Sequence, residues 1–463
     1  MKRFTYELKR MTWLMLLLVC VQGTTVAQNI GDTFTADKLK YCVLNKQEVE
    51  VCGHVDDRWD ATGEVIIPET VEAAEWNRNY TVTTIGNYAF YGRSGLTEIN
   101  IPNSVTTIES EAFRDCSGLR AINIPNSVTT IGKGAFACCS GLTAINIPNS
   151  VTTIGSTAFY GCSRLTTINI PNSVTTIESH AFHGCSGLTA INIPNSVTTI
   201  GEGAFYGCSG LTALTVNADN AHFSSSEGVL LDKSQQKLIQ CPAGKKGEYK
   251  IPNSVTKIGE YAFGGCSGLT DINIPNSVTT IGEYAFGDCS GLTAINIPNS
   301  VTTIGNRAFS FCGRLTSINI GNSVTSIGNE AFYYCRELTS INIPNSVTTI
   351  GNEAFYNCSG LETLYFHSIN PPTTTRDCFE GCYNIQTIYV PQEAVATYQA
   401  TEPYNEYNIQ GMDETTGIGE VETTEMPQSD NIYDLNGRLV RTDGNLQALP
   451  KGIYILNGKK VVR

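Results

Sequence analysis

A segment of 23 residues recurs almost unchanged along most of this chain, and it constrains the fold more than any other feature. The copy at residues 142–164 reads LTAINIPNSVTTIGSTAFYGCSR. Similar copies begin at Leu96, Leu119, Leu142, Leu165 and Leu188 and, after an irregular segment that starts at Leu211, at Leu269, Leu292, Leu315 and Leu338. A fixed period of this length is typical of a solenoid, in which every repeat forms one coil of an extended stack.

The apolar residues of one repeat are too few to stabilise it in isolation. In the copy at 142–164 we expect the following residues to face inward: Leu142, Ile145, Ile147, Val151, Ile154, Ala158, Phe159 and Cys162. Their burial gives less free energy than the conformational entropy lost when the 23 residues become ordered. Neighbouring coils supply the difference by covering each other's apolar edges, so only the two terminal coils need caps.

Within a repeat, the run TAINIP at residues 143–148 alternates between polar and apolar side chains and ends at a proline. This pattern predicts a short strand with Ile145 and Ile147 inward and Asn146 outward. The next residues, NSVTTIG, are expected to form a turn and an extended piece, and AFYGC a single helical or 3₁₀ turn. The predicted fold class is therefore a repeat solenoid, mainly β with short helical turns, with a 23-residue period and one parallel strand per coil.

These residues together resemble the BspA-type leucine-rich repeat, whose units read L-x-x-I-x-I-P-x-x-V-x-x-I-G-x-x-A-F-x-x-C. The resemblance covers residues 65–391. The pattern differs from the better-known L-x-x-L-x-L-x-x-N repeat, since Ser150 and not asparagine is the ninth residue of the copy at 142–164. Members of the BspA-type family are adhesins that engage host matrix proteins, so the resemblance implies a binding role at a cell surface.

The segments before the repeats predict export and a cap. Residues 1–27 have the basic, apolar and small-residue regions of a secretory signal peptide, and the apolar run at 11–21 is too short to cross a membrane. Residues 28–64 are expected to form a β-hairpin cap that covers the first coil. Cys42 and Cys52 share one side of this hairpin, and the sequence leaves open whether they form a disulfide or remain two buried thiols.

The solenoid is expected to span residues 65–391, and an irregular segment, which we call the island, interrupts it. From Leu211 to Leu269 the chain exceeds two periods by 12 residues, and the runs VLLD and KLIQ predict a hairpin island at residues 216–250. Similar interruptions occur in the BspA-type family. The island is expected to belong to the solenoid and not to a second domain, and a binding role for it is one open interpretation.

Beyond the repeats, residues 392–430 are expected to form a closing segment, with a short helix at 394–399, and an acidic linker. The tail at 431–463 contains strand-like runs around glycine turns. It resembles the C-terminal sorting domain of type IX secretion, which implies contact with that export machinery. The alternative is a small terminal β-module with no targeting role.

Ten of the 17 cysteines share one repeat position and are expected to form an internal file: Cys116, Cys139, Cys162, Cys185, Cys208, Cys266, Cys289, Cys312, Cys335 and Cys358. Buried free thiols are favoured over disulfides, because parallel side chains in a file have no unique partner. A metal site lacks the paired C-x-x-C clusters that zinc usually requires. Cys378 and Cys382 are four residues apart, but Cys382 already fits the repeat, so a redox pair is not favoured.

No set of residues outside the repeat pattern predicts catalysis, a cofactor or a metal. His180, His183 and Cys185 have a spacing that suits zinc, but other copies vary freely at the two histidine positions, which favours solvent-facing side chains. Asp56 and Asp57 lie in a turn-like segment without partner carboxylates. The formal net charge of −13 argues against nucleic acid as a partner, and no later segment is long and apolar enough to be a transmembrane span.

Two sets of outward-facing residues form the candidate binding surface. The first is a file of asparagines on the predicted strands: Asn100, Asn123, Asn146, Asn169, Asn192, Asn273, Asn296, Asn319 and Asn342. This file fits either a solvated face with amides bonded along the stack or a shallow platform for extended ligands. The second set gathers aromatic residues near the AF motif: Tyr160, Tyr206, Tyr261, Tyr284, Phe311, Tyr333, Tyr334 and Tyr356. Aromatic side chains on a rigid array are common in recognition surfaces, but they fit packing against a neighbouring coil equally well.

The sequence thus predicts an exported protein, secreted or at a bacterial cell surface, that binds an extracellular protein or glycan and is not an enzyme. The preferred interpretation is an adhesin that contacts host or neighbouring-cell proteins through the solenoid. The alternative is a glycan-capturing or structural surface component without an adhesin role.

Overall fold

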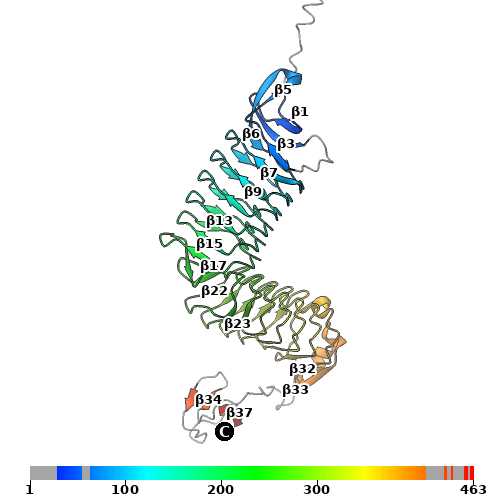
Figure 1. Ribbon diagram of the computed structural model, residues 1–463. Helices are drawn as coiled ribbons and strands as arrows, with labels where there is room; N and C mark the ends of the chain where they lie inside the picture. Colours follow the sequence, from blue (N-terminus) through cyan, green and yellow to red (C-terminus); the bar gives the residue numbers. More distant parts are fainter. Residues whose placement is uncertain are drawn as a thin grey trace, which may run out of the picture. The chain divides into compact units, whose positions relative to one another are not determined.

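The computed structural model describes residues 29–54 and 63–412, together with the backbone of four strands between residues 432 and 462. The chain divides into two compact units, Met1–Gly411 and Met412–Arg463. In the first unit the repeats form consecutive coils of a solenoid, stacked side by side (Figure 1). The predicted mainly β solenoid with a 23-residue period and parallel strands is confirmed, since equivalent residues of successive coils pair at that separation.

Every regular coil begins with a short strand, and most of these strands pair in parallel with their neighbours. β11 (Ala144–Asn146) lies between β9 (Ala121–Asn123) and β13 (Thr167–Asn169), with Asn146 opposite the equivalent asparagine on each side. As predicted, Ile145 is buried and Asn146 is exposed. The other strands of this first set are β4 (Gly63–Ile66), β7 (Leu96–Asn100), β15 (Ala190–Ile193), β17 (Ala213–Val216), β21 (Gly247–Lys250), β23 (Leu269–Asn273), β25 (Ala294–Asn296), β27 (Ser317–Asn319), β29 (Ser340–Ile343), β31 (Thr363–Phe366) and β32 (Thr387–Pro391).

A second strand is present in each regular coil, so the expectation of one strand per coil was wrong. β12 (Thr153–Ile154) pairs in parallel with β10 (Thr130–Ile131) and β14 (Thr176–Ile177). Two residues are too few to show an alternating pattern in the sequence, but stacking places the same two residues beside each other in every coil. The other strands of this second set are β6 (Arg78–Ile85), β8 (Thr107–Ile108), β16 (Thr199–Ile200), β22 (Lys257–Ile258), β24 (Thr280–Ile281), β26 (Thr303–Ile304), β28 (Ser326–Ile327) and β30 (Thr349–Ile350).

The AF segment of each coil forms consecutive turns in place of the predicted helical turn. In the copy at 142–164 a left-handed backbone, with φ of 54° at Thr157 and 68° at Gly161, interrupts any helix. Alternate N–H groups then point to the next coil: Phe159 donates to the Ala181 carbonyl at 2.8 Å, and Gly161 to the His183 carbonyl at 2.7 Å. These bonds form a third ladder between coils, at the edge that we call the turn edge.

The core consists of columns of equivalent side chains. Phenylalanine rings of successive regular coils stack with centroids 5.0–5.7 Å apart and nearly parallel planes. The predicted cysteine file lies inside, and all ten side chains are buried free thiols. In nine of the ten, the sulfur donates to the phenylalanine carbonyl of the preceding coil at 3.0–3.2 Å. Each cysteine therefore bonds to the coil before it as well as packing against it.

The N-terminal coil is covered by a β-hairpin. β2 (Leu39–Val43) and β3 (Glu48–His54) are antiparallel, β1 (Thr33–Ala36) pairs with β2, and β3 continues the second sheet by pairing in parallel with β6. Cys42 and Cys52 form a disulfide, which is the first of the two alternatives that the sequence left open. Between β4 and β6 the first coil contains β5 (Thr70–Ala73), which is antiparallel to β6, and then the 3₁₀ helix η1 (Ala74–Trp76).

The island is a coil that carries an extra hairpin. β19 (Val229–Asp232) and β20 (Lys237–Gln240) are antiparallel, as predicted, and the sequence analysis missed β18 (Phe223–Ser226), which pairs with β19. The second sheet is broken here, because β16 ends a 10-stranded sheet and β18 begins an 8-stranded one. The buried core is likewise divided into two clusters that meet at the island.

The last coils close with short helical elements. These are η2 (Arg376–Phe379), η3 (Gln392–Ala394), η4 (Tyr404–Glu406) and the expected short helix, α2 (Val395–Gln399); β33 (Ile409–Met412) then pairs beside β32. In the second unit β34 (Ile432–Asp434), β35 (Leu439–Arg441), β36 (Ile453–Leu456) and β37 (Lys459–Val462) form an antiparallel sheet. The expected signal peptide, Asp56, Asp57 and the acidic linker lie outside the described residues. Among the residues that are described, no helix has the length and apolar character needed to cross a membrane.

Candidate binding surface

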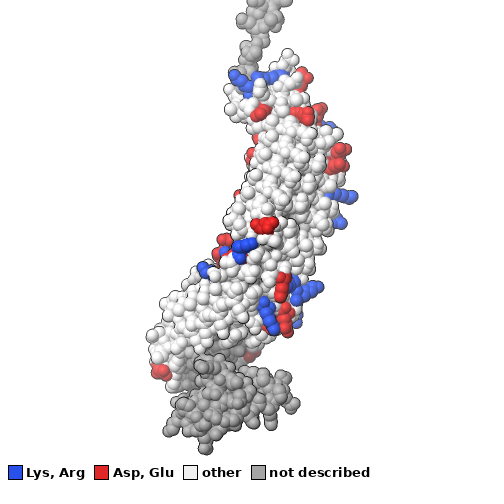
Figure 2. All heavy atoms as spheres, turned by 90° about the vertical axis from the view of Figure 1, so that its left-hand side faces the viewer, with Lys and Arg blue, Asp and Glu red and all other residues white. Residues whose placement is uncertain are grey.

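The nine asparagines of the file on the first set of strands are all exposed. Asn319 donates an amide hydrogen bond to Asn296 at 2.6 Å, and the Thr215 hydroxyl donates to Asn192 at 3.2 Å. The amides are thus bonded along the stack at some coils, as the first interpretation of this file expected. Small residues such as Ala121 and Ala144 flank the asparagines, so the face is shallow. Figure 2 shows one face of the stack, on which charged side chains are sparse along the regular coils.

The predicted aromatic residues lie on the turn edge and form two clusters. The first, which we call the island cluster, contains Tyr160, His180, His183, Tyr206, Tyr261 and Tyr284. The ring of His183 lies between Tyr160 at 4.7 Å and Tyr206 at 4.6 Å, measured between centroids. Both histidines are half-buried, so the expectation that they face solvent was wrong. Their partners come from neighbouring coils, which a single repeat does not reveal.

The island cluster joins coils on both sides of the island. Tyr206, which precedes the island, and Tyr284, which follows it, both donate to the carboxylate of Asp288, the second at 2.8 Å. Burial and the bond to Asp288 raise the pKa of Tyr206, and burial raises the pKa of Tyr284. Burial, helped by the nearby His180, lowers the pKa of His183 to about 4. The rings of Tyr206, Tyr284 and His183 are therefore neutral at physiological pH and present polar edges beside apolar faces.

The second cluster, which we call the distal cluster, contains Phe311, Tyr333, Tyr334 and Tyr356. Tyr333 and Tyr356 stack with centroids 5.1 Å apart, and the guanidinium of Arg336 lies 4.9 Å from the centroid of Tyr334. The side chains thus pack across coils, yet Phe311 remains 42% exposed, as Tyr160 of the island cluster does at 39%. Packing and display therefore occur together on the turn edge.

Sequence reasoning missed a third aromatic group in the first coil. Tyr88 and Tyr91 are 57% and 46% exposed, with ring centroids 6.0 Å apart, and the Arg114 guanidinium lies 5.9 Å from the Tyr91 centroid. Both tyrosines occupy the repeat positions that Tyr261 and Tyr160 occupy later in the chain. Alignment of the first coil with the regular repeats identifies them, but the candidate surface was drawn only from later copies.

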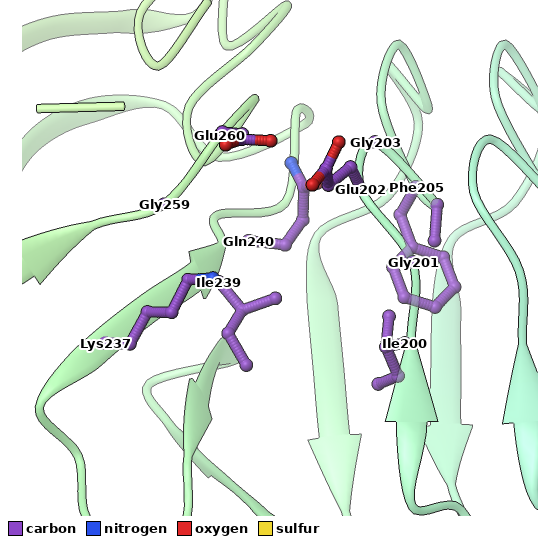
Figure 3. Close-up of a pocket in the computed structure, with 11 residues that line it drawn as sticks. Ile200, Gly201, Glu202, Gly203, Phe205, Lys237, Ile239, Gln240, Gly259 and Glu260 are labelled. Atoms are coloured by element: carbon purple, nitrogen blue, oxygen red, sulfur yellow. The ribbon is translucent and has the colours of Figure 1, made fainter. Parts of the chain in front are cut away.

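A cavity of about 40 Å³ lies at the island, where the second sheet is broken. Ile200 and Gly201 line one side and Lys237 and Gly259 the other, while the side chains of Glu202, Glu260 and Gln240 converge on it (Figure 3). A hydrogen bond with Glu202, together with burial, raises the pKa of the Glu260 carboxyl. The two acids therefore share a proton more readily than isolated glutamates do.

The described part of the chain contains no group of three or more histidine, cysteine, aspartate or glutamate side chains arranged to hold a metal ion. His180, His183 and Cys185 are not brought together, since the histidines join the aromatic cluster and the Cys185 thiol donates to the Phe159 carbonyl at 3.0 Å. Cys378 and Cys382 are both buried free thiols, and burial raises the pKa of Cys378 to about 12.

Comparisons with known proteins agree with this architecture. The model of the BspA type leucine rich repeat region matches residues 80–224, 245–362 and 303–413. A leucine rich cell surface protein of Faecalibacterium prausnitzii is 27% identical over 79% of this chain and 96% of its own, with a TM-score of 0.57. Two further solved structures share the fold. The pneumococcal vaccine antigen PcpA is 20% identical over 83% of this chain and 100% of its own, with a TM-score of 0.58. A leucine-rich repeat protein of Eubacterium ventriosum is 21% identical over 85% of this chain and 99% of its own, with a TM-score of 0.54.

No match was found among curated protein sequences. The family model covers more than half of the chain, and its matches fall on the coils described above. The chain therefore belongs to the BspA-type leucine-rich repeat family.

Proposed function

We propose that this chain is an exported surface protein that binds extracellular protein partners through its solenoid, as an adhesin contacting host or neighbouring-cell proteins. The observation that supports this role most directly is the turn edge, where aromatic side chains from successive coils are fixed by stacking and still expose part of their area. Rigid aromatic side chains give large contact areas at low entropic cost, which is why they dominate protein recognition surfaces.

The similarity to a leucine rich cell surface protein of Faecalibacterium prausnitzii supports a location at the cell surface. The basic and apolar pattern at residues 1–27 supports a signal peptide, and the tail at 431–463 supports contact with the type IX export machinery. Mass spectrometry of the protein from the native cell surface tests both proposals, because it locates the mature termini. A mature chain that retains residues 1–27 would contradict export by a signal peptide.

A binding assay tests the role of the turn edge. The probes are purified matrix proteins, and the variant is Phe311→Gly with Tyr334→Gly. Both residues are the second one after the phenylalanine of the AF motif, a position that Gly161 and Gly184 occupy in other copies. Because φ is 59° at Phe311 and 60° at Tyr334, the backbone accepts glycine at both sites. We expect saturable binding by the native chain and a loss of about tenfold in affinity for the variant, because exposed aromatic residues are typical hot spots.

The matched control is Asn357→Gly, which makes the same change at the same repeat position without removing a ring. Flat binding curves across the matrix panel would contradict the adhesin proposal.

The alternative, a glycan-capturing or structural surface component, is supported by the exposed asparagine file, because side-chain amides form hydrogen bonds with sugar hydroxyls. A glycan array separates the two. We further propose that the chain is not an enzyme, and turnover on a hydrolase panel would contradict this.

A further inference from the structure

A groove of about 510 Å³ lies at the start of the first set of strands. The residues that line it follow the file cysteines closely in the sequence, and none of them belongs to the aromatic clusters. It is lined by Ser117, Gly118, Gly141 and Thr143, with Arg120 and Arg164 among its walls. A Cβ atom added at Gly118 would lie 2.2 Å from the Ser94 carbonyl oxygen, and one at Gly141 would lie 2.4 Å from that of Ser117. The coils therefore approach closely here, and the floor of the groove is backbone.

The two arginines break the repeat pattern at this groove. Arg120 stands where other copies have Thr97 or Thr143, and Arg164 where they have Gly118 or Gly141. Both side chains are exposed, and within the described residues neither guanidinium forms an ion pair. In a chain with a net charge of −13, this groove presents two available positive charges on a polar surface.

The spacing of the charges follows from the stack. Arg120 is the second residue of the copy at 119–141 and Arg164 the last residue of the copy at 142–164, so 44 residues, two short of two full periods, separate them. Nearly two strand spacings of ~4.8 Å therefore place them about 10 Å apart along the stack. This separation is comparable to the length of a disaccharide. Serine and threonine hydroxyls between the arginines offer both donors and acceptors to sugar hydroxyls.

An extended acidic peptide fits the groove less well. The backbone N–H of Arg120 already donates to the Thr97 carbonyl at 3.4 Å, and that of Thr143 to the Arg120 carbonyl at 3.1 Å. A peptide therefore finds no free strand edge on which to add, and no large apolar residue lines the groove to receive its side chains.

We propose that this groove binds an acidic polysaccharide, with Arg120 and Arg164 contacting anionic groups on successive disaccharides. A guanidinium forms paired hydrogen bonds with a sulfate or a carboxylate, so either group supplies the recognised chemistry. Two carboxylates are close in sequence to lining residues. Asp115 comes two residues before Ser117 and lies 3.5 Å from the Arg114 guanidinium, whereas Glu98 is exposed and directly follows Thr97, which also lines the groove. This inference goes beyond the adhesin role, because it concerns neither the aromatic clusters nor a protein ligand, and it names a site other than the asparagine file for the capture of a glycan.

Calorimetric titration of the full chain tests the proposal, with a heparin tetrasaccharide as the sulfated probe and a tetragalacturonate as the carboxylated one. The variants Arg120→Thr and Arg164→Gly restore the residues of other copies, so both are expected to fold. We expect one or both probes to bind and each variant to lose about tenfold in affinity, as a lost charged hydrogen bond implies. The variant Glu98→Ala should strengthen binding by about twofold, and added salt should weaken it.

The matched control is Arg314→Gly. Arg314 occupies the repeat position of Arg164, but the residue that corresponds to Arg120 in this part of the stack is Thr270, so no second arginine accompanies it. It should bind like the native chain. Absence of binding by both probes, or equal weakening by Arg314→Gly, would overturn the proposal. Equal, arginine-dependent binding of a polyglutamate peptide would overturn the assignment to a polysaccharide. None of these outcomes bears on the binding of matrix proteins by the distal cluster.

Discussion

At the scale of single residues, two positions in every regular coil hold the backbone in the left-handed conformation. In the copy at 142–164 these are Thr157 and Gly161. Other copies place Asp115, Asp288 or Phe311 at the second position, each with φ near 60°, and no copy places a β-branched residue there. The position therefore accepts a side chain but excludes branching next to the backbone.

We expect Gly161→Val to lower the free energy of unfolding by about 1–2 kcal/mol, the usual cost of a left-handed conformation for a side chain. A Cβ atom at this site would meet only ordinary contacts, the nearest being the Cys138 sulfur at 3.5 Å, so the cost is conformational and not steric. Urea unfolding measures it. Gly161→Asp, which copies a natural occupant of the position, should cost less. Equal losses for the two variants would refute this explanation.

The cysteine file makes a second prediction at this scale. Burial raises the pKa of Cys116 and of Cys208 to about 12, and it also raises the pKa of Cys139 and of Cys312. Few of these four thiols are therefore ionised at physiological pH. Cys138 is the one free cysteine among the described residues that is not fully buried. Iodoacetamide should therefore label Cys138 first, although burial and Asp115 raise its pKa as well.

Peptide mass spectrometry of the native chain follows this labelling residue by residue, and labelling in urea provides the control in which all free thiols react. Rapid labelling of Cys162 in the folded chain would be incompatible with an internal file. The sequence predicted the burial of these cysteines, because ten of them share one position. It did not predict the bond from each thiol to the preceding phenylalanine carbonyl, since that contact joins residues 26 apart in different coils.

At the scale of elements, periodicity predicted what one repeat contains and missed what only the stack creates. The strand around Ile145 was predicted because its side chains alternate. The strand β12 was missed because it is two residues long and exists only by pairing with β10 and β14. The aromatic clusters show the same limit: the residues were identified, but their partners lie in neighbouring coils or, for Tyr206 and Asp288, across the island.

The island also makes a prediction about pH. The pKa of Glu260 is raised above its ordinary value of 4.5 by its hydrogen bond with Glu202 and by burial. A raised folded-state pKa contributes stability that is present below the unfolded-state value and is lost as pH rises through the folded-state value. The native chain should therefore lose some stability between about pH 4.5 and neutrality that Glu202→Gln does not lose.

Melting temperatures of both proteins across this pH range give the comparison. Glu353→Gln removes a glutamate from a coil outside the cavity and should leave the pH dependence of the native chain unchanged. Because both acids of the pair are exposed to solvent, the difference should be small and should shrink in high salt. A Glu202→Gln variant with the same pH dependence as the native chain would show that the two carboxyls do not share a proton.

At the scale of the solenoid, stability is expected to be a sum of contacts between neighbouring coils, and the island is the place where these contacts change most. The second sheet is interrupted there, and the buried residues form one cluster before it and another after it. Side-chain contacts on the turn edge nevertheless cross this break, since Tyr206 and Tyr284 donate to the same carboxylate of Asp288. The two buried clusters are thus linked across the island by side-chain contacts on the turn edge.

Removing one phenylalanine from each cluster tests this division. Phe159→Ala and Phe309→Ala delete equivalent buried rings and should each destabilise the chain by about 3–5 kcal/mol through lost burial and a cavity. Hydrogen exchange followed by mass spectrometry should show Phe159→Ala exposing amides of the coils before the island and Phe309→Ala those after it. Each variant serves as the control for the other. Uniform loss of protection along residues 63–412 in either variant would instead mean that the solenoid unfolds as one unit and that the island transmits stability as well as any regular coil does.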